Sequence, residues 1–316
     1  MKKEDLRIVF MGTPDFGLHC LDMLKQEDFN LVACISQPDR KAGRGHKMQP
    51  PPVKVWAQEN NIPVYQFEKI SSQGIDVLQE LRPDVCVTAA FGQILSEELL
   101  SIPKYGVFNV HASLLPELRG SAPIQWAIIN GKEKTGVTIM RTVYKLDAGD
   151  IITQDELDIP FEMNAGELYD KLSVLGAKTL KKALMALISG EIEYTPQDDA
   201  KHTYFPMFKK DFGCIDFSWD CKRVYDFVRG TDPYPGCFIV YDGMRIKVKK
   251  VSFDICSHKY AFGEIVCADR KEGFKVAARD GIVSLLEIQC PGKKAVLAKD
   301  YFLGNSICTG TVLETF

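Results

Sequence analysis

The sequence predicts an α/β protein, in which an open and mostly parallel sheet is followed by a smaller β-rich domain. Apolar strands alternate with helices up to about residue 190, a polar stretch follows, and short strands separated by turns fill residues 208–316. The chain has 316 residues. This length favours two domains, because single cores seldom grow beyond about 250–300 residues.

The N-terminal part reads as repeated strand-helix units. Residues 85–90 are almost wholly apolar, as expected of a strand buried in the middle of a sheet. We expect strands at 7–11, 31–36, 63–65, 85–90, 106–111, 136–143 and 150–158, and helices at 15–27, 53–60, 71–81, 121–130 and 164–188. This order predicts a Rossmann-like sheet with helices on both faces, and we assign residues 1–189 to this domain.

The C-terminal part is strand-rich. Residues 190–207 are polar and extended, and we interpret them as a linker between domains. After them we expect a helix near 219–229 and strands at 237–241, 245–251, 263–268, 274–278 and 283–289. Short strands at this spacing predict a small antiparallel β-barrel of the OB kind over residues 208–316.

Composition is that of an ordinary globular protein, with 46% hydrophobic and 26% charged residues. The chain has no apolar run of about 18 residues, and its first residues contain no apolar signal segment, so we expect a cytoplasmic protein outside any membrane. Ten cysteines occur without a Cys-x-x-Cys pair. We interpret them as reduced, mostly buried thiols and expect no metal site.

Charge is unevenly distributed along the chain. The net charge is −3, yet residues 208–316 contain 17 basic and 14 acidic side chains. The C-terminal part is therefore the basic end of the protein. This favours, weakly, a polyanionic partner for that domain.

The first candidate for chemistry is the strand that contains Asn109 and His111. Alternating side chains of a strand face opposite sides, so these two share a face about 7 Å apart. An amide donor beside an imidazole suits acyl-group chemistry, and Asp147 in a nearby turn is the candidate acid. A histidine satisfied within the core and an aspartate that merely stabilises its turn are the alternatives.

Two loops are the next candidates. Residues 113–123 form an apolar loop at the carboxyl end of a strand, where open α/β sheets bind ligands, and it suits a flat heteroaromatic ring unless it is a plain connector. Residues 40–47 contain four Lys or Arg side chains, which either grip phosphates or are simply solvated. The Gly12–Gly17 turn lacks the dinucleotide-binding glycine pattern, which disfavours a nicotinamide-dependent enzyme.

A basic strand lies in the C-terminal domain. Alternation along residues 245–250 places Arg245, Lys247 and Lys249 on one face and Ile246 and Val248 in the core. A solvated strand face is one interpretation of this pattern. The other is a barrel face that follows an RNA backbone.

With these motifs the chain resembles the methionyl-tRNA formyltransferases, a branch of the folate-dependent formyltransferase family. The Asn-x-His and Ser-Leu-Leu-Pro motifs are shared across that family, whereas the 37–54 segment and the C-terminal barrel are typical of the tRNA branch. The matching stretches are Gly12–Phe16, Gln37–Arg40, Ala42–Gly45, Pro52–Lys54, Asn109–His111, Ser113–Pro116, Arg119–Gly120, Ala122–Gln125, Thr135–Met140, Leu146–Asp147, Gly149–Asp150, Pro233–Pro235 and Pro291–Ala295.

This resemblance implies a transferase that moves the formyl group of 10-formyltetrahydrofolate to the α-amine of methionine on initiator methionyl-tRNA, without a metal. It implies a catalytic set of Asn109, His111 and Asp147. The folate site implied consists of Phe91, Gln93, Ile94, Leu95, Ser113, Leu114, Leu115 and Pro116. The tRNA contacts implied are Arg40, Lys41, Arg44, His46, Lys47, Lys209, Lys247 and Lys249. We expect a monomer.

Two other functions stay open from the sequence. One is a folate-dependent formyl enzyme with a different acceptor, such as a nucleotide, a sugar or water. The other is an RNA-binding module whose α/β domain has lost its activity. The intact Asn109 and His111 pair argues against the second, and the basic loop with the C-terminal domain argues against the first.

Overall fold

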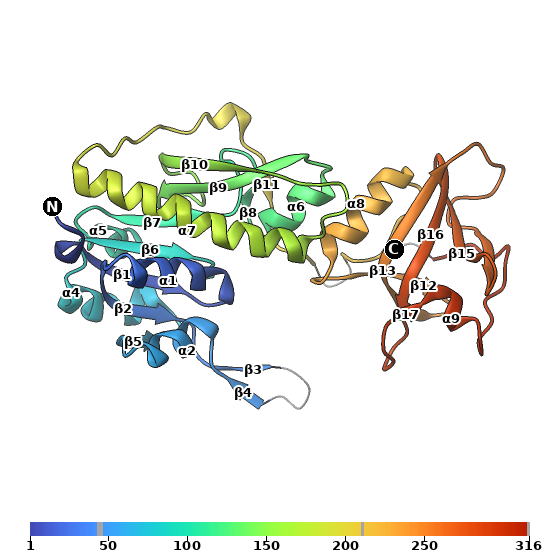
Figure 1. The fold of residues 1–316 in the computed structure, drawn as a ribbon, viewed down its shortest axis with the longest axis horizontal. Helices are drawn as coiled ribbons and strands as arrows, with labels where there is room; N and C mark the ends of the chain where they lie inside the picture. Colours follow the sequence, from blue (N-terminus) through green and yellow to red (C-terminus); the bar gives the residue numbers. More distant parts are fainter. Residues whose placement is uncertain (43–46, 210–211, 315–316) are drawn as a thin grey trace. The chain divides into compact units, whose positions relative to one another are not determined.

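The computed structural model describes residues 1–42, 47–209 and 212–314 (Figure 1). Its contacts divide the chain into two compact units. The first consists of Met1–Pro123, Thr135–Asp158 and Tyr169–Phe205, and the second of Ile124–Lys134, Ile159–Leu168 and the chain from Pro206 onward. The chain therefore passes between the units several times. The limits expected from the sequence, at residues 189 and 207, stay a prediction.

In the described part of the chain, seven strands form the sheet of the first unit, in the order β10-β9-β7-β6-β1-β2-β5. They are β1 (Arg7–Gly12), β2 (Asn30–Ser36), β5 (Val64–Gln66), β6 (Val85–Ala89), β7 (Val107–His111), β9 (Lys134–Arg141) and β10 (Ile151–Asp158). From β5 to β7 all neighbours are parallel, and β9 is antiparallel to β7. The predicted open, mostly parallel sheet is confirmed.

Helices flank this sheet, and one of them determines which face of β7 is free. The helices are α1 (Leu18–Gln26), α2 (Pro52–Glu59), α3 (Ile70–Gln73), α4 (Ile75–Leu81), α5 (Glu97–Ser101) and α7 (Ala165–Ser189). Gly176 of α7 approaches β7 so closely that an added Cβ would lie 3.0 Å from Val110 Cγ1. Val110 thus faces α7. Asn109 and His111 point to the opposite side of the sheet, because side chains alternate along a strand.

One helix differs from its prediction. Residues 71–81 were expected to form a single helix, but the structure has α3 and α4 with Gly74 between them. Glycine is a poor helix former because it loses the most backbone freedom on folding. Helix α4 then ends at Arg82, whose φ is 46°, and Pro83 prevents the helix from continuing.

The basic loop contains a hairpin that the sequence did not indicate. Strands β3 (Arg40–Ala42) and β4 (Lys47–Gln49) pair in antiparallel fashion. At its base, Lys54 donates to both carboxylate oxygens of Asp39 at 2.8 and 2.9 Å, and Gln66 donates to Asp39 Oδ1 at 2.8 Å. These hydrogen bonds lower the pKa of Asp39, with the bond from Lys54 as the largest cause. The hairpin base is therefore tied to α2 and β5.

The polar stretch before the second unit pairs with the first unit as far as Phe205. Thr195 forms a bridge to Ile151, the first residue of β10. Further along, β11 (Tyr204–Phe205) pairs in parallel with β8 (Arg119–Gly120). The segment therefore contacts the loop that follows β7, which is close to the candidate site.

An antiparallel sheet forms the second unit. The described strands are β12 (Cys237–Tyr241), β13 (Met244–Ile255), β14 (Ile265–Asp269), β15 (Gly273–Ala278), β16 (Gly281–Gln289) and β17 (Val296–Leu297), with order β12-β13-β16-β15-β14 and β17 beside β16. The predicted antiparallel domain is confirmed. Among the described residues its ladders leave the sheet open, but Glu314 bridges Val240 of β12 and Val312 bridges Glu264 beside β14. The C-terminal segment thus reaches both edges of the sheet.

Helix α8 (Cys221–Thr231) joins this sheet to the segments from the N-terminal half. Its Arg229 is 8% exposed and donates to Asp226 Oδ1 and to the carbonyl of Met163, each at 2.8 Å. A buried guanidinium needs such partners, because an unpaired buried charge is costly. Helix α6 (Pro123–Ile129) lies almost wholly in the same unit.

The sequence analysis also concerned membrane helices and cysteines. In the part of the chain that the structure describes, no helix is both long and apolar enough to cross a bilayer. Five cysteines are buried, namely Cys20, Cys34, Cys86, Cys221 and Cys237, and the other five are partly or fully exposed. Burial raises the pKa of the Cys20 thiol to about 12, which keeps it protonated and unreactive.

Candidate active site

The site begins at Asn109, in the middle of β7. Its side chain is partly buried, and its Oδ1 accepts a hydrogen bond of 2.9 Å from Thr88 Oγ1. Thr88 is its register partner on the neighbouring strand β6. Because Thr88 holds the amide oxygen, the amide nitrogen points away from β6. Among the described residues, none accepts a hydrogen bond from that nitrogen.

His111 ends the same strand and is 6% exposed. Its Nε2 lies 3.0 Å from the carbonyl oxygen of Leu118. A carbonyl only accepts, so Nε2 is the protonated nitrogen and Nδ1 of the neutral ring has a free lone pair. Nδ1 in turn lies 3.8 Å from Asp147 Oδ1. The structure therefore brings the two predicted catalytic groups His111 and Asp147 together.

Asp147 is 9% exposed and lies in the turn between β9 and β10. Its φ is 48°, in the left-handed region that aspartate tolerates better than most residues. Its second carboxylate oxygen accepts a hydrogen bond of 2.8 Å from the backbone N–H of Gly120. One oxygen of Asp147 is thus anchored to the main chain, and the other faces His111.

Residues 118–121 support both of these side chains. Leu118 offers its carbonyl to His111, while Gly120 offers its N–H to Asp147. Thr203 fixes this segment, since its hydroxyl accepts from Leu118 N at 2.8 Å and its carbonyl from Arg119 N at 2.9 Å. Gly120 has φ 100°, and a Cβ there would meet Phe205 O at 2.4 Å. Only glycine fits this close approach.

The predicted folate loop follows directly on the strand. Ser113 is fully buried and donates from Oγ to Glu117 O at 2.8 Å. Thr138 of β9 donates to Ser113 O at 2.6 Å and accepts from Leu115 N at 3.0 Å. Leu115 is buried, whereas Leu114 and Pro116 are partly exposed. The loop is therefore held through its backbone.

The other predicted folate residues lie after β6, and their side chains differ in exposure. Phe91 and Leu95 are buried in the core of the first unit. Gln93 accepts from Ile70 N and donates to Phe67 O, both at 2.8 Å, so its amide fixes the loop to α3. Ile94 is 76% exposed. Of these four side chains, Ile94 is the one that is open to a ligand.

The predicted tRNA contacts are spread over both units. Arg40, Lys41 and Lys47 are exposed on the hairpin, whereas Arg44 and His46 lie outside the described residues. In the second unit Lys209 and Lys247 are exposed, and Lys249 forms an ion pair with Asp232. Ile246 and Val248 are buried, which confirms the predicted alternation along β13. The role of these cations in binding stays a prediction.

Sequence reasoning missed two residues of the site, Thr88 and Gln197. Thr88 did have a signal, since it is the polar residue within an otherwise apolar strand, Val85–Ala89. Gln197 had none. Its amide nitrogen donates to the carbonyls of Asp147 and Gly149, about fifty residues earlier in the sequence.

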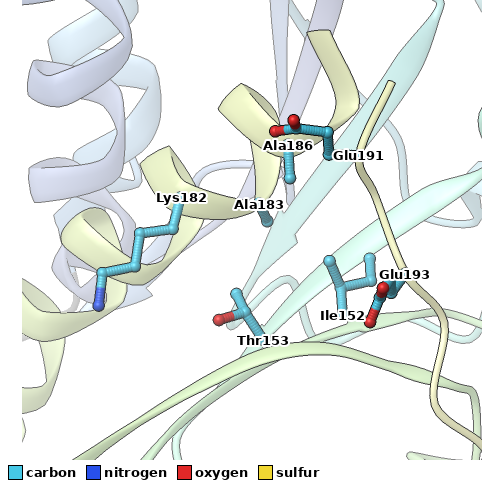
Figure 2. A pocket seen from close by; sticks show the side chains of 7 residues that line it. All are labelled: Ile152, Thr153, Lys182, Ala183, Ala186, Glu191 and Glu193. Carbon is cyan, nitrogen blue, oxygen red and sulfur yellow. The ribbon is translucent and has the colours of Figure 1, made fainter. Parts of the chain in front are cut away.

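A separate cavity of about 250 Å³ lies elsewhere in the first unit (Figure 2). Its lining consists of Ile152 and Thr153 of β10, Lys182, Ala183 and Ala186 of α7, and Glu191 and Glu193. None of the predicted catalytic residues lines it.

Among the described residues, no group of three or more His, Cys, Asp or Glu gathers as a metal site would.

Comparison with known families identifies the class of protein. The pattern of the family described as Formyl transferase matches residues 6–184, and that of the Formyl transferase C-terminal domain matches residues 207–306. The chain therefore belongs to the formyl transferase family. This confirms the prediction that it is an enzyme that transfers a one-carbon group.

Within that family, the similar curated proteins are methionyl-tRNA formyltransferases. The one of Ruminiclostridium cellulolyticum is 43% identical over 312 residues, which is 98% of this chain and 99% of the relative. That of Bacillus subtilis is 45% identical over 309 residues, 97% of each chain. These relatives confirm the resemblance drawn from the motifs.

A solved structure shows the same fold. It is an N-formyltransferase from Helicobacter canadensis, solved with folinic acid and dTDP-3-aminofucose. It is 19% identical, with a TM-score of 0.69, and the match covers 89% of this chain and 99% of that one. At this level of identity the likeness concerns the fold alone.

Proposed function

We propose that the chain transfers the formyl group of 10-formyltetrahydrofolate to the α-amino group of methionine on initiator methionyl-tRNA. One observation carries the proposal. His111 and Asp147 lie close together at the carboxyl end of β7, with Asn109 two residues earlier on the same face of the strand, in a chain that is 43–45% identical to methionyl-tRNA formyltransferases over nearly its whole length. Ligands of open α/β sheets bind at this edge.

Asn109 supplies a hydrogen-bond donor for the reaction. When the amine attacks the formyl carbon, negative charge develops on the formyl oxygen. Thr88 holds the Asn109 carbonyl oxygen, which leaves Nδ2 to donate to that charge. A donor fixed in advance stabilises such charge without having to reorganise, which is why a donor of this kind accelerates acyl transfer.

His111 and Asp147 move the proton. The Leu118 carbonyl occupies Nε2–H, so Nδ1 is the ring nitrogen that takes the proton from the attacking amine. Asp147 Oδ1, at 3.8 Å, stabilises the imidazolium that results. The new C–N bond forms first and gives a tetrahedral adduct with negative charge on the formyl oxygen. The bond to the folate nitrogen breaks as this adduct collapses, and His111 returns the proton to that nitrogen. The protein needs no covalent intermediate for this transfer.

The donor would bind along the edge formed by β6 and β7. These strands are parallel neighbours, so the loops after them, 90–95 and 112–118, leave the sheet at the same edge. Leu114 and Ile94 offer apolar surface, and the hydrogen-bonded backbone of Ser113–Pro116 gives a fixed wall. These features fit the flat pterin ring of a folate.

The acceptor would be held by basic residues. Strand β2 is parallel to β1 and ends where the basic hairpin begins, so the hairpin rises from the same edge of the sheet as the catalytic residues. Exposed Arg40, Lys41 and Lys47 can contact phosphates of the acceptor stem. Lys209 and Lys247 of the second unit would extend that contact along the RNA.

The decisive experiment is a transfer assay with labelled 10-formyltetrahydrofolate. We expect formyl-methionine to form on charged initiator tRNA and not on uncharged tRNA or on free methionine. A nucleotide sugar is offered in parallel, because the Helicobacter canadensis structure holds one. Transfer to the sugar instead of the tRNA would replace our acceptor. Binding of RNA without formyl transfer to any acceptor would contradict the proposed activity as a whole.

A further inference from the structure

The segment 194–205 contains a polar side chain that reaches back to the catalytic turn. We propose that Gln197 is a positioning residue that holds the main chain of Asp147 so that its carboxylate faces His111. The inference rests on the proposed function, because it assigns a role in the mechanism to a residue outside the catalytic set.

Gln197 uses both hydrogens of its amide on this turn. Its Nε2 donates to the carbonyl of Asp147 at 2.9 Å and to the carbonyl of Gly149 at 2.7 Å. The two carbonyls flank Ala148, so the amide holds the main chain on both sides of this residue, where the turn ends. The Gln197 side chain is partly buried. A water molecule in its place would donate to the same carbonyls but would hold the turn less firmly, because it is not attached to the chain.

Arg119 determines which way the Gln197 amide points. Its Nε and Nη2 donate to Gln197 Oε1 at 3.0 and 2.8 Å. A guanidinium only donates, so the amide oxygen must face Arg119 and the amide nitrogen must face the turn. Arg119 is 2% exposed and is itself paired with Asp199 at 2.8 Å. The orientation of Gln197 is thereby fixed by a buried, paired cation.

The network closes on the catalytic pair. Arg119 lies between Leu118, whose carbonyl holds His111, and Gly120, whose N–H holds Asp147. One short segment therefore fixes His111 and the side chain of Asp147, while Gln197 fixes the main chain of Asp147. Asp147 has φ 48°, in the left-handed region, which aspartate adopts at a smaller cost than most residues, and the bonds from Gln197 hold the turn in this conformation. Without Gln197 the turn can relax and the carboxylate can leave Nδ1.

Gln197→Glu tests this role. The substitution keeps the length of the side chain and an acceptor for Arg119, but it places a carboxylate oxygen against two carbonyl oxygens. We expect kcat to fall on the order of 10- to 100-fold, because a small misplacement of a catalytic group has this effect. The KM values for the folate and for methionyl-tRNA should stay within about 2-fold, because no binding contact changes. The pH dependence of kcat should also change.

Two further variants keep the test clear. Gln197→Met removes the donor without adding charge, and its kcat should also be lower than that of wild type. The assay temperature is kept below the unfolding midpoint of the variant, so that the folded protein is measured. Gln289→Glu is the matched control, since Gln289 also donates to a backbone carbonyl, that of Lys293 at 2.8 Å, but in the second unit. The control should leave kcat and its pH profile unchanged.

Asp147→Asn, in the same assay, separates this inference from the proposed function. Loss of turnover in Asp147→Asn together with unchanged kcat and pH profile in both Gln197 variants would overturn the role of Gln197 and leave the mechanism standing. Full turnover in Asp147→Asn would instead refute the mechanism. A lower unfolding midpoint in the Gln197 variants with kcat unchanged would show a purely structural residue, and would also overturn the inference.

Discussion

Asn109 and His111 show how far single residues can be interpreted from sequence. Alternation along a strand predicted their common face, and the structure places both on β7 with Val110 on the side of α7. It adds the partners, Thr88 for one and the Leu118 carbonyl for the other. Those partners decide which atoms stay available for chemistry, namely Asn109 Nδ2 and His111 Nδ1.

Replacing Asn109 by alanine tests its proposed donor at the scale of one residue. We expect the rate of formyl transfer to fall on the order of 10²- to 10³-fold, the usual effect of removing one donor to a developing oxyanion. The KM for the folate should change little, because the contact strengthens in the transition state. Steady-state kinetics on the purified variant measure both.

The control is Asn305→Ala in the second unit, where the amide donates to Tyr301 O at 2.8 Å. Circular dichroism should show that both variants are folded. Wild-type turnover in Asn109→Ala would remove this residue from the mechanism.

At the scale of elements, the basic stretch 40–47 belongs to a hairpin that the pattern of apolar residues along the chain did not predict. Its composition indicated an exposed loop that either grips phosphates or is simply solvated, without regular structure. The structure has paired strands β3 and β4 whose base is held by Asp39, Lys54 and Gln66. These partners are far apart in the sequence, and side chains distant along the chain become neighbours only when β2, β5 and α2 pack together. The hairpin therefore presents Arg40, Lys41 and Lys47 from a fixed base.

Removal of the hairpin charges tests that element. In the triple variant Arg40→Ala, Lys41→Ala, Lys47→Ala, we expect a higher KM for methionyl-tRNA and an unchanged KM for the folate. The salt dependence of kcat/KM for the tRNA should become shallower, by about one unit of slope for each phosphate that the variant no longer binds. Assays over a range of salt concentrations provide the measurement.

A matched control removes lysines from another surface, Lys171→Ala with Lys178→Ala on α7, where both side chains are exposed. It should leave the tRNA kinetics and their salt dependence as they are. Equal losses of tRNA and folate use in the hairpin variant would argue that the hairpin supports the fold and does not bind RNA.

The whole molecule depends on contacts between distant parts of the chain. In the first unit, Glu27 after α1 accepts from Lys3 in the N-terminal turn η1 (Lys3–Asp5) at 2.8 Å and from Lys181 of α7 at 2.6 Å. Hydrogen bonds from Lys181 and Lys3 lower the pKa of Glu27 to about 2. One carboxylate thus joins three segments that are far apart in the sequence.

This pair of bonds predicts a pH-dependent stability. A carboxylate whose pKa is lowered on folding stabilises the native state above its usual pKa, and this contribution is lost as the pH falls towards the folded pKa. Glu27→Gln should therefore be less stable than wild type at about pH 7, and the difference should shrink steadily below about pH 4.5. Urea unfolding at several pH values measures the difference.

Glu59→Gln, on the exposed side of α2, serves as the control and should show a small difference that does not follow this pH course. A Glu27→Gln protein as stable as wild type at neutral pH would show that the ion pairs contribute nothing measurable, as many exposed pairs do.

The sequence by itself determined most of the strands and helices, the antiparallel character of the second unit, and the motifs around Asn109 and His111. These features depend on periodicity, turn residues and local composition, which short stretches of chain contain in full. Tertiary structure alone decided that residues of the first half join the second unit, that Asp147 lies 3.8 Å from His111, and that Gln197 holds the turn of Asp147. Such contacts join residues far apart in the chain, and their partners are determined by the packing of the folded protein.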